Sequence, residues 1–289
     1  RSSAASDVYK RQIVTPLAVR VAPAGKGSTA LSIVVAGSSI ALIVGLPLGR
    51  AIGIAVGWRV TFLIIAAIAF GVLGLLAAVL KKSPSDNNFS LRKLPALIKT
   101  PSLWGIYLLT LVAISGHFTA YSYIEPFLSR IAGLGNNAIT VVLTLFGAVD
   151  LVGSFIFSRH YNNNVETFFK MAVAGLCFCL LMLLPASCTE WSAFLQCMLW
   201  GLSINFFNLS FQSEIIRHAP QGTAVAMSIY SGIYNVGIGT GALVGGSVCD
   251  GIGIRYIGYV GGAIALAAVI YCIRHVVPVL RRATAGAEI

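Results

Sequence analysis

The chain has 289 residues, of which 57% are hydrophobic and 10% are charged, with a formal net charge of +11 and a mean hydropathy of +0.87. A chain of this length that folded in water would bury one core beneath a polar surface, and so few charges cannot supply that surface. The composition therefore excludes a soluble domain and predicts a membrane protein with several spans. Transport, conduction, sensing and catalysis at the bilayer are the functions open to it.

The polar string RSSAASDVYKRQ at residues 1–12 shares no pattern with the chain that follows, and it lacks the apolar core of a signal peptide. We interpret it as a sequencing or cloning artefact. Residues 13–80 are expected to form a partial N-terminal bundle that contains the end of a fourth helix and all of a fifth and a sixth. The first three helices of that bundle and most of the fourth are expected to be missing.

Eight apolar segments are long enough for a helix to cross a bilayer core, which takes roughly 20 residues. They lie at residues 31–56, 60–80, 103–127, 137–158, 166–186, 190–213, 223–249 and 254–278. The predicted fold class is therefore all-α, a polytopic membrane helix bundle. The last six segments form a C-terminal bundle over residues 101–280, which a central loop at residues 81–100 precedes and a tail at residues 281–289 follows.

Positive charge marks alternate loops and predicts the orientation of the chain. The central loop carries five basic residues against one acid, Asp86; the basic residues are Lys81, Lys82, Arg92, Lys93 and Lys99. Such loops stay on the cytoplasmic side, so the central loop and the C-terminus are expected in the cytoplasm. Basic loops that face anionic lipid also account for the net charge. Nucleic acid is not an expected partner, because no basic patch with accessible aromatic residues is present.

The sequence offers little for catalysis or metal binding. Its four histidines are scattered, and its six cysteines form no C-x-x-C pair and lie mostly inside apolar segments. No phosphate-binding loop or nucleophile motif is present. We therefore expect no enzyme activity, no catalytic residue, no cofactor and no metal, and the absence of a nucleotide site argues against a pump driven by ATP.

Polar residues recur at helical spacing inside two of the apolar segments. His117, Tyr121 and Glu125 are spaced i, i+4, i+8 and are predicted to share one face of the helix at residues 103–127. Hydroxyl, imidazole and carboxylate groups on one face suit a polyol ligand, whose hydroxyl groups both donate and accept. The alternative is that Glu125 lies in water at the outer interface, with Tyr121 in the aromatic belt of the membrane.

A second stripe, at spacing i, i+3, i+7, is formed by Asn205, Asn208 and Gln212. Amides are costly to expose to lipid, so these side chains either bind neighbouring helices or line a substrate pathway; we favour the pathway. Two tyrosines four residues apart in the next segment are candidates for one wall of the same pathway, with an adjacent asparagine; they are Tyr230, Tyr234 and Asn235.

Two charged residues inside the spans are candidates for proton coupling or gating. Asp150 lies well within its segment, where low polarity favours the protonated carboxyl and would allow it to carry a proton. It could equally be a neutralised structural acid or the partner of a cation. Arg50 either extends to the outer interface or forms an ion pair between the two bundles, which would break and re-form as they move.

Small residues every fourth position mark two helices that correspond in the two bundles. The first has Gly37, Gly45, Gly49 and Gly53 with Pro47 among them, and the other has Gly237, Gly241 and Gly245. Small residues four apart let two helix backbones approach closely in lipid. Their matched positions predict two parallel repeats, as in many secondary transporters.

Several strings resemble the major facilitator superfamily. GLPLGRAIG at residues 45–53, followed by GWRVTF at residues 57–62, is similar to the antiporter motif of exporters in that superfamily, and VAPAGKGSTALS at residues 21–32 is similar to the preceding cytoplasmic loop. YLLTLVAISGHFTAYSYIEPF at residues 107–127 and SGIYNVGIGTGALVGG at residues 231–246 resemble the seventh and eleventh helices of bacterial sugar-efflux transporters of the SotB type. The resemblance covers nearly all of residues 13–280.

The resemblance implies a fold of two six-helix halves that rock around a central cavity. It also implies the export of sugars such as arabinose and lactose in exchange for protons. The expected partners are a small sugar, protons and the lipid of the bacterial inner membrane, in which we expect a monomer. A proton-coupled exporter of drugs or amphiphiles is the alternative within the same superfamily.

Overall fold

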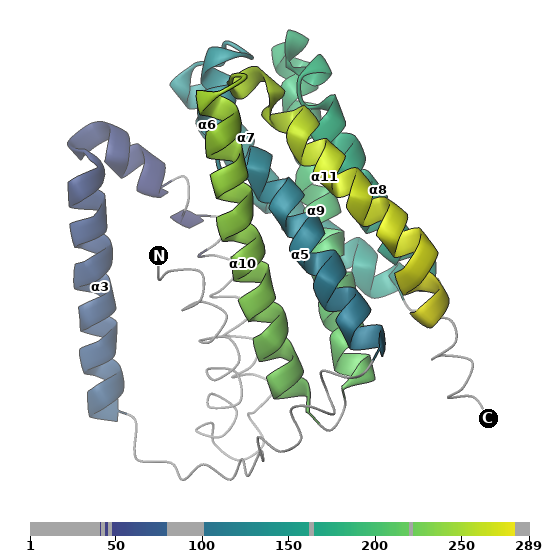
Figure 1. Cartoon of the computed structure of the whole chain (residues 1–289). Helices are drawn as coiled ribbons and strands as arrows, with labels where there is room; N and C mark the ends of the chain where they lie inside the picture. The colour runs from purple at the N-terminus through teal and green to yellow at the C-terminus, as the bar shows by residue number, and fades with distance from the viewer. Residues whose placement is uncertain are drawn as a thin grey trace.

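The computed structural model describes residues 41, 44–45, 48–79, 101–161, 165–219 and 222–280. These residues form helices joined by short connections (Figure 1), which confirms the all-α prediction. The predicted artefact at residues 1–12, the loop at 81–100, the tail at 281–289, Gly37 and Pro47 lie outside the described residues.

The N-terminal part contributes a helical segment at residues 48–56 and α3 at Trp58–Val79. Gly57 separates them with a φ of +89°, in a region that L-residues with a side chain rarely adopt. The turn therefore depends on glycine. In Figure 1, α3 stands apart from the helices of the C-terminal part, and large apolar side chains such as Phe62 and Phe70 are exposed along it.

The C-terminal part contains the six predicted helices close to their predicted bounds. They are α5 (Pro101–Tyr121) with α6 (Ile124–Arg130), α7 (Asn136–His160), α8 (Val165–Met182), α9 (Glu190–His218), α10 (Thr223–Asp250) and α11 (Ile257–Tyr271). Short helical turns of other types, at Pro185–Cys188 (η3) and Ile254–Tyr256 (η4), precede α9 and α11, and a π-helical turn at Cys272–Val276 (η5) extends α11. The start of α9 is set by Thr189, whose side chain accepts a hydrogen bond from Ser192 N at 3.2 Å in a capping box.

The predicted helix at residues 103–127 is broken near its end. Helix α5 ends at Tyr121 and α6 begins at Ile124, with Tyr123 N bonded to Ala120 O in a tighter turn. Proline lacks an amide hydrogen and its ring clashes with the carbonyl four residues earlier. Pro126 therefore cannot continue the helix that contains Ser122, and α6 leaves in a new direction.

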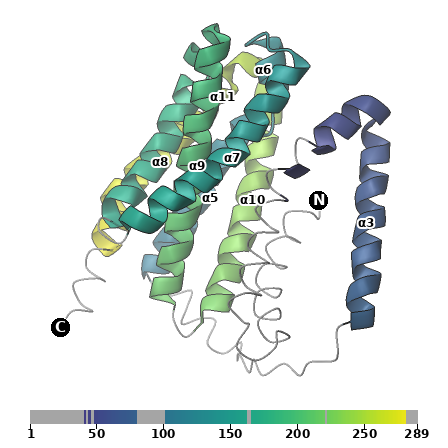
Figure 2. The same ribbon diagram turned by 180° about the vertical axis from the view of Figure 1, so that it is seen from behind.

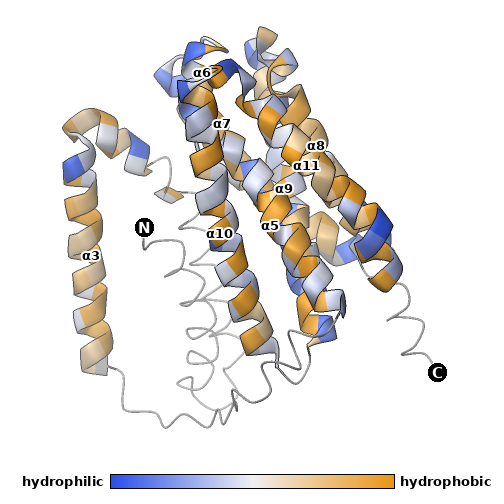
Figure 3. Ribbon diagram, in the orientation of Figure 1, coloured by the Kyte–Doolittle hydropathy of each residue, from blue (hydrophilic) through white to orange (hydrophobic). Residues whose placement is uncertain are grey.

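Six of the described helical stretches are long and apolar enough to cross a membrane. They begin at Trp58, Pro101, Asn136, Val165, Glu190 and Ile254. Helix α10 is of similar length but is not among these six. Figure 3 shows apolar residues along the helix bodies and the most hydrophilic residues mainly near their ends, as expected for helices that lie in lipid.

Helix α5 lies at the centre of the C-terminal bundle, between α10 and α11, while α8 packs on α9 and α11, and α7 packs on α9 (Figures 1 and 2). Glycines at the contacts allow the backbones of neighbouring helices to approach closely. A Cβ atom added to Gly116 on α5 would lie 2.7 Å from Gly261 O on α11. Buried aromatic side chains, including Tyr107, Phe127 and Phe207, fill the space between the helices.

The glycines of α10 contact α5 of the same bundle. A Cβ atom on Gly237 would lie 2.9 Å from Ile114, and one on Gly241 would lie 2.5 Å from Ser115 O; Gly245 approaches Thr119 O. Of the matching N-terminal positions, Gly45 and Gly49 have no described atom within 4 Å of such a Cβ, and Gly53 approaches Thr61 at 3.7 Å. The α10 glycines thus allow α10 and α5 to pack closely within the C-terminal bundle.

Candidate functional site

Aromatic rings from four helices meet in the middle of the C-terminal bundle. We call this cluster the aromatic box; it consists of His117, Phe118 and Tyr121 on α5, Phe146 on α7, Trp200 on α9 and Tyr234 on α10. Neighbouring ring centroids lie 4.8–6.4 Å apart, mostly edge to face, which is the favoured geometry for aromatic pairs.

His117 and Trp200 form the buried polar centre of the aromatic box. The indole Nε1–H of Trp200 donates a hydrogen bond to His117 Nδ1 at 3.0 Å. The side chain of His117 also stacks on Tyr121, with centroids 5.1 Å apart and an interplanar angle of 18°. Both His117 and Trp200 are buried, with 3% and 0% of their surface exposed. The predicted pair His117 and Tyr121 is therefore brought together, and Trp200 is a member that the sequence analysis missed.

A close approach of α7 and α9 positions Trp200 beside the other rings. A Cβ atom on Gly201 would lie 2.7 Å from Phe146 O. Only glycine permits that distance. The close approach of the two helices places the neighbouring Trp200 in contact with Phe146 and Tyr121. This contact explains how Trp200 on α9 reaches His117 on α5.

Polar side chains border the aromatic box on the α7 and α9 sides. The Asp150 carboxylate is half-buried and interacts electrostatically with Tyr121 and Tyr234. Asn205 Nδ2 donates to the backbone oxygen of Asp150 at 3.3 Å, and Asn208 forms a side-chain hydrogen bond with Tyr234. Part of the predicted amide stripe is thus adjacent to the predicted carboxylate.

Two buried oxygen atoms near this border have no hydrogen-bond partner among the described residues. They are Asn205 Oδ1 and the hydroxyl oxygen of Tyr230, whose ring lies edge to face with Tyr234 at 5.9 Å. Unpaired buried polar atoms are unusual and call for a partner. By contrast, Asn235 donates to Ser231 O in its own helix, and the described residues provide no hydrogen bond for the half-buried Gln212.

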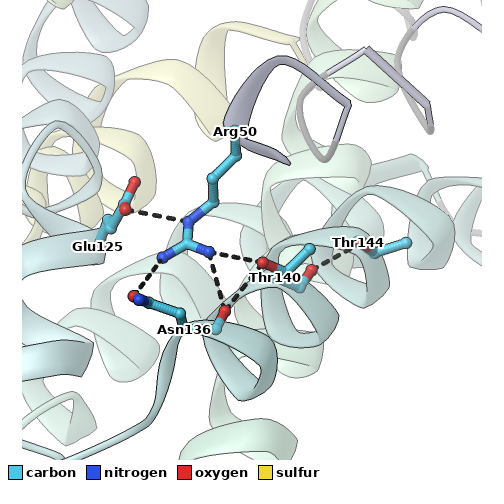
Figure 4. A network of polar contacts seen from close by, with 5 residues as sticks. All are labelled: Arg50, Glu125, Asn136, Thr140 and Thr144. Carbon is cyan, nitrogen blue, oxygen red and sulfur yellow. Dashed lines mark hydrogen bonds and ion pairs between the residues drawn. The ribbon is translucent and has the colours of Figure 1, made fainter. Parts of the chain in front are cut away.

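Arg50 joins the N-terminal part of the chain to the α6 end of the C-terminal bundle. Figure 4 shows its guanidinium between α6 and the start of α7, where Nε lies 3.0 Å from Glu125 Oε1 and Nη1 lies 2.8 Å from Asn136 O and 2.6 Å from Thr140 Oγ1. The Arg50 side chain is 7% exposed and that of Glu125 is 50% exposed. We call this contact the Arg50 latch.

The position of Glu125 differs from the prediction that it shares a face with His117 and Tyr121. Glu125 lies in α6, beyond the break that ends α5 at Tyr121, and it pairs with Arg50 instead of extending the aromatic box. An ion pair between the bundles was one of the two predictions for Arg50, but the sequence did not identify Glu125, 75 positions away, as its partner.

A buried carboxylate at the opposite end of the bundle was missed by the sequence analysis. Glu214 on α9 is 2% exposed and accepts a hydrogen bond of 2.8 Å from the hydroxyl of Tyr161, the residue that follows α7. His218 Nδ1 lies 3.5 Å from Glu214 Oε2, and Arg217 lies within 3.9 Å of the other oxygen. Burial and the adjacent carboxylate raise the pKa of Tyr161, so its hydroxyl stays protonated and donates.

We expect Tyr161→Phe to lower the free energy of unfolding by about 2 kcal/mol, because it leaves a buried carboxylate without its neutral donor. Thermal unfolding in detergent micelles measures the loss. Tyr259→Phe is the matched control, since Tyr259 is an exposed tyrosine on α11 with no described hydroxyl partner. Equal melting temperatures for the two variants would contradict the role assigned to this bond.

The described residues contain no group of three or more His, Cys, Asp or Glu side chains that could hold a metal ion. The six cysteines are free, and four of them are buried among apolar side chains. The four buried cysteines are not arranged to bind a metal, and they act as small apolar packing residues.

Comparison with known proteins gives two findings. The family model described as Major Facilitator Superfamily matches residues 12–226. A protein of Helicobacter acinonychis (strain Sheeba) described as "Probable sugar efflux transporter" is 45% identical over 259 residues, which are 90% of this chain and 66% of the relative. The chain therefore spans slightly less than two thirds of the length of this relative.

Proposed function

The chain belongs to the Major Facilitator Superfamily, and from this premise we propose that it is part of a secondary transporter that exports sugars in exchange for protons. The observation that carries the proposal is the aromatic box with the polar groups at its border, gathered from α5, α7, α9 and α10. The name of the Helicobacter relative also supports a sugar as the cargo.

The chemistry of the site fits a small polyol. A sugar ring has an apolar C–H face that packs on aromatic side chains, and hydroxyl groups that both donate and accept. The aromatic box supplies the aromatic side chains for the C–H face. Asn205 Oδ1 and the Tyr230 hydroxyl supply hydrogen-bonding atoms that have no other described partner. Arabinose and lactose-like sugars are the proposed cargo, and Asn208, Gln212 and Asn235 are proposed to line the route beside them.

Proton exchange is assigned to Asp150. It is the carboxylate beside the aromatic box, and it interacts with two of the tyrosines of that box. Protonation there would remove a negative charge at the position where cargo binds. An exchanger requires that binding of the proton and binding of the cargo disfavour each other, and two adjacent binding positions provide this.

We assign gating to the Arg50 latch. An ion pair between the two parts of the chain stabilises the arrangement in which it forms, and it must break when the two parts separate. By the charge of the loops this end faces outward, so the latch would close the site on that side. The protein is then an inner-membrane monomer that alternates access with its C-terminus in the cytoplasm.

Exchanging the two latch charges tests this assignment. Arg50→Glu alone should raise the rate of outward opening and reduce coupled export about tenfold or more, because it places two carboxylates together. The double variant Arg50→Glu with Glu125→Arg should recover a large part of the export rate, which labelled sugar efflux measures. Failure of the double variant to exceed either single variant would count against the latch.

The direct test of the function is uptake of labelled L-arabinose into inside-out vesicles that contain the full chain, with and without an imposed proton gradient. Uptake that depends on the gradient and is reduced by unlabelled lactose is the expected result. Uptake that is equal with and without the gradient would refute proton exchange, and no uptake of either sugar would refute sugar export.

Export of cationic amphiphiles is the second candidate, and one observation favours it. Aromatic rings beside a carboxylate, as at Tyr121, Tyr234 and Asp150, are also the usual surroundings of a bound organic cation. Proton-driven uptake of a cationic dye, without uptake of sugar, in the same vesicles would select this function.

A further inference from the structure

The bond between Trp200 and His117 determines which nitrogen of the imidazole carries the hydrogen. The indole nitrogen of tryptophan can only donate. Since Trp200 Nε1 lies 3.0 Å from His117 Nδ1, the latter must accept and has no hydrogen. A neutral imidazole with a bare Nδ1 carries its hydrogen on Nε2.

The same bond opposes protonation of His117. A charged imidazole has a hydrogen on both nitrogens, so the Nδ1–H would point at the indole N–H and two donors would face each other. Both groups are buried, which disfavours a charge on the imidazole. His117 is therefore held in one neutral form.

The rings around His117 also restrict the orientation of its imidazole. Tyr121 stacks on one face, and Phe118 and Trp200 lie edge to face with centroids at 4.8 Å and 5.4 Å. Among the described residues the His117 side chain forms a hydrogen bond only through Nδ1. The hydrogen on Nε2 is therefore left to donate to a bound molecule that offers a lone pair.

We infer that Trp200 fixes His117 as a neutral hydrogen-bond donor to the cargo through Nε2, and thereby excludes His117 from carrying protons. This rests on the proposed function for the nature of the cargo. Nε2–H donates to a hydroxyl, ether or carbonyl oxygen and repels a cation, so it selects a sugar over a cationic amphiphile at this atom. The titratable group in contact with the imidazole is Tyr121, which in turn interacts with Asp150 and Cys197, and Asp150 also interacts with Tyr234.

Nitrogen-15 NMR of the full chain in lipid nanodiscs, labelled at histidine, tests the tautomer. The chain has four histidines, and the spectrum of His117→Gln identifies the signals that belong to His117. We expect one bare nitrogen and one protonated nitrogen, unchanged between about pH 5 and 8. In Trp200→Phe the His117 signals should shift with pH or report both tautomers. Titration of His117 in the unsubstituted protein, or a hydrogen on Nδ1, would overturn the inference.

Sugar binding tests the role of Nε2 toward cargo. Trp200→Phe keeps an aromatic ring but frees the imidazole, and should weaken arabinose binding roughly tenfold. Trp191→Phe is the matched control, because Trp191 lies on the same helix and is 85% exposed. Equal affinities in the two variants would overturn the cargo role. No sugar binding by the unsubstituted protein would overturn that role together with the proposed function, while the NMR spectra decide the tautomer independently.

Discussion

Replacing Gly241 with leucine is expected to prevent α10 from packing on α5, and with it the folding of the C-terminal bundle. A Cβ atom at this position would lie 2.5 Å from Ser115 O and 2.8 Å from Phe118 Cβ. Overpacking a core costs about 1–3 kcal/mol where side chains can move aside. Here the obstacle is a backbone oxygen inside a helix, so we expect a loss at or above the upper end of that range.

The measurement is the yield of monodisperse protein in size-exclusion chromatography, followed by thermal unfolding. Gly239→Leu is the matched control. It places the same side chain on the same helix at a glycine where an added Cβ meets no described atom within 4 Å. We expect Gly239→Leu to resemble the unsubstituted protein and Gly241→Ala to fall between the two. A similar yield for both leucine variants would show that the α5–α10 contact is not close.

Asp150→Asn is expected to abolish proton-driven accumulation of cargo, by at least about a hundredfold, while it leaves exchange of labelled for unlabelled cargo intact. The amide preserves the shape and much of the polarity of the side chain, but it cannot take up a proton. Exchange without a gradient requires binding and alternating access alone. The two activities should therefore separate.

Both activities can be followed in one preparation of proteoliposomes. The first uses an imposed pH difference and the second uses preloaded unlabelled cargo at equal pH. Asn205→Asp supplies a comparison, since it adds a carboxylate beside Asp150 and should disturb both activities. Full gradient-driven accumulation by Asp150→Asn would remove this residue from the proton route.

Much of the fold was predictable because hydropathy alone delimits helices that lie in lipid. The bounds of α7, α9 and α10 agree with the predicted segments at their N-terminal ends to within a residue. The break before α6 was missed, although Pro126 marks it, because the apolar run continues past the proline. Hydropathy responds to composition and carries no information about backbone geometry.

The site was predictable only where polar residues repeat at helical spacing. That pattern predicted that His117 and Tyr121 lie together, as their stacked rings do, and it drew attention to Asn205, which bonds to the backbone of Asp150. It could not identify Trp200, because an aromatic residue on an apolar helix is ordinary until its neighbour across the bundle is known. Glu214 was overlooked for another reason: it follows the predicted apolar segment at residues 190–213, whereas α9 extends to His218 and buries it.

Two tyrosines show how α5 and α10 are arranged. Tyr107 donates to Ala226 O at 3.0 Å and Tyr123 donates to Ala242 O at 3.1 Å, each across 119 positions of sequence. The offset is the same at both ends, so the two helices run parallel and in constant register. A slide of one turn would break both bonds. We therefore expect α5 and α10 to move together, so that any conformational step that displaces α5 displaces α10 with it.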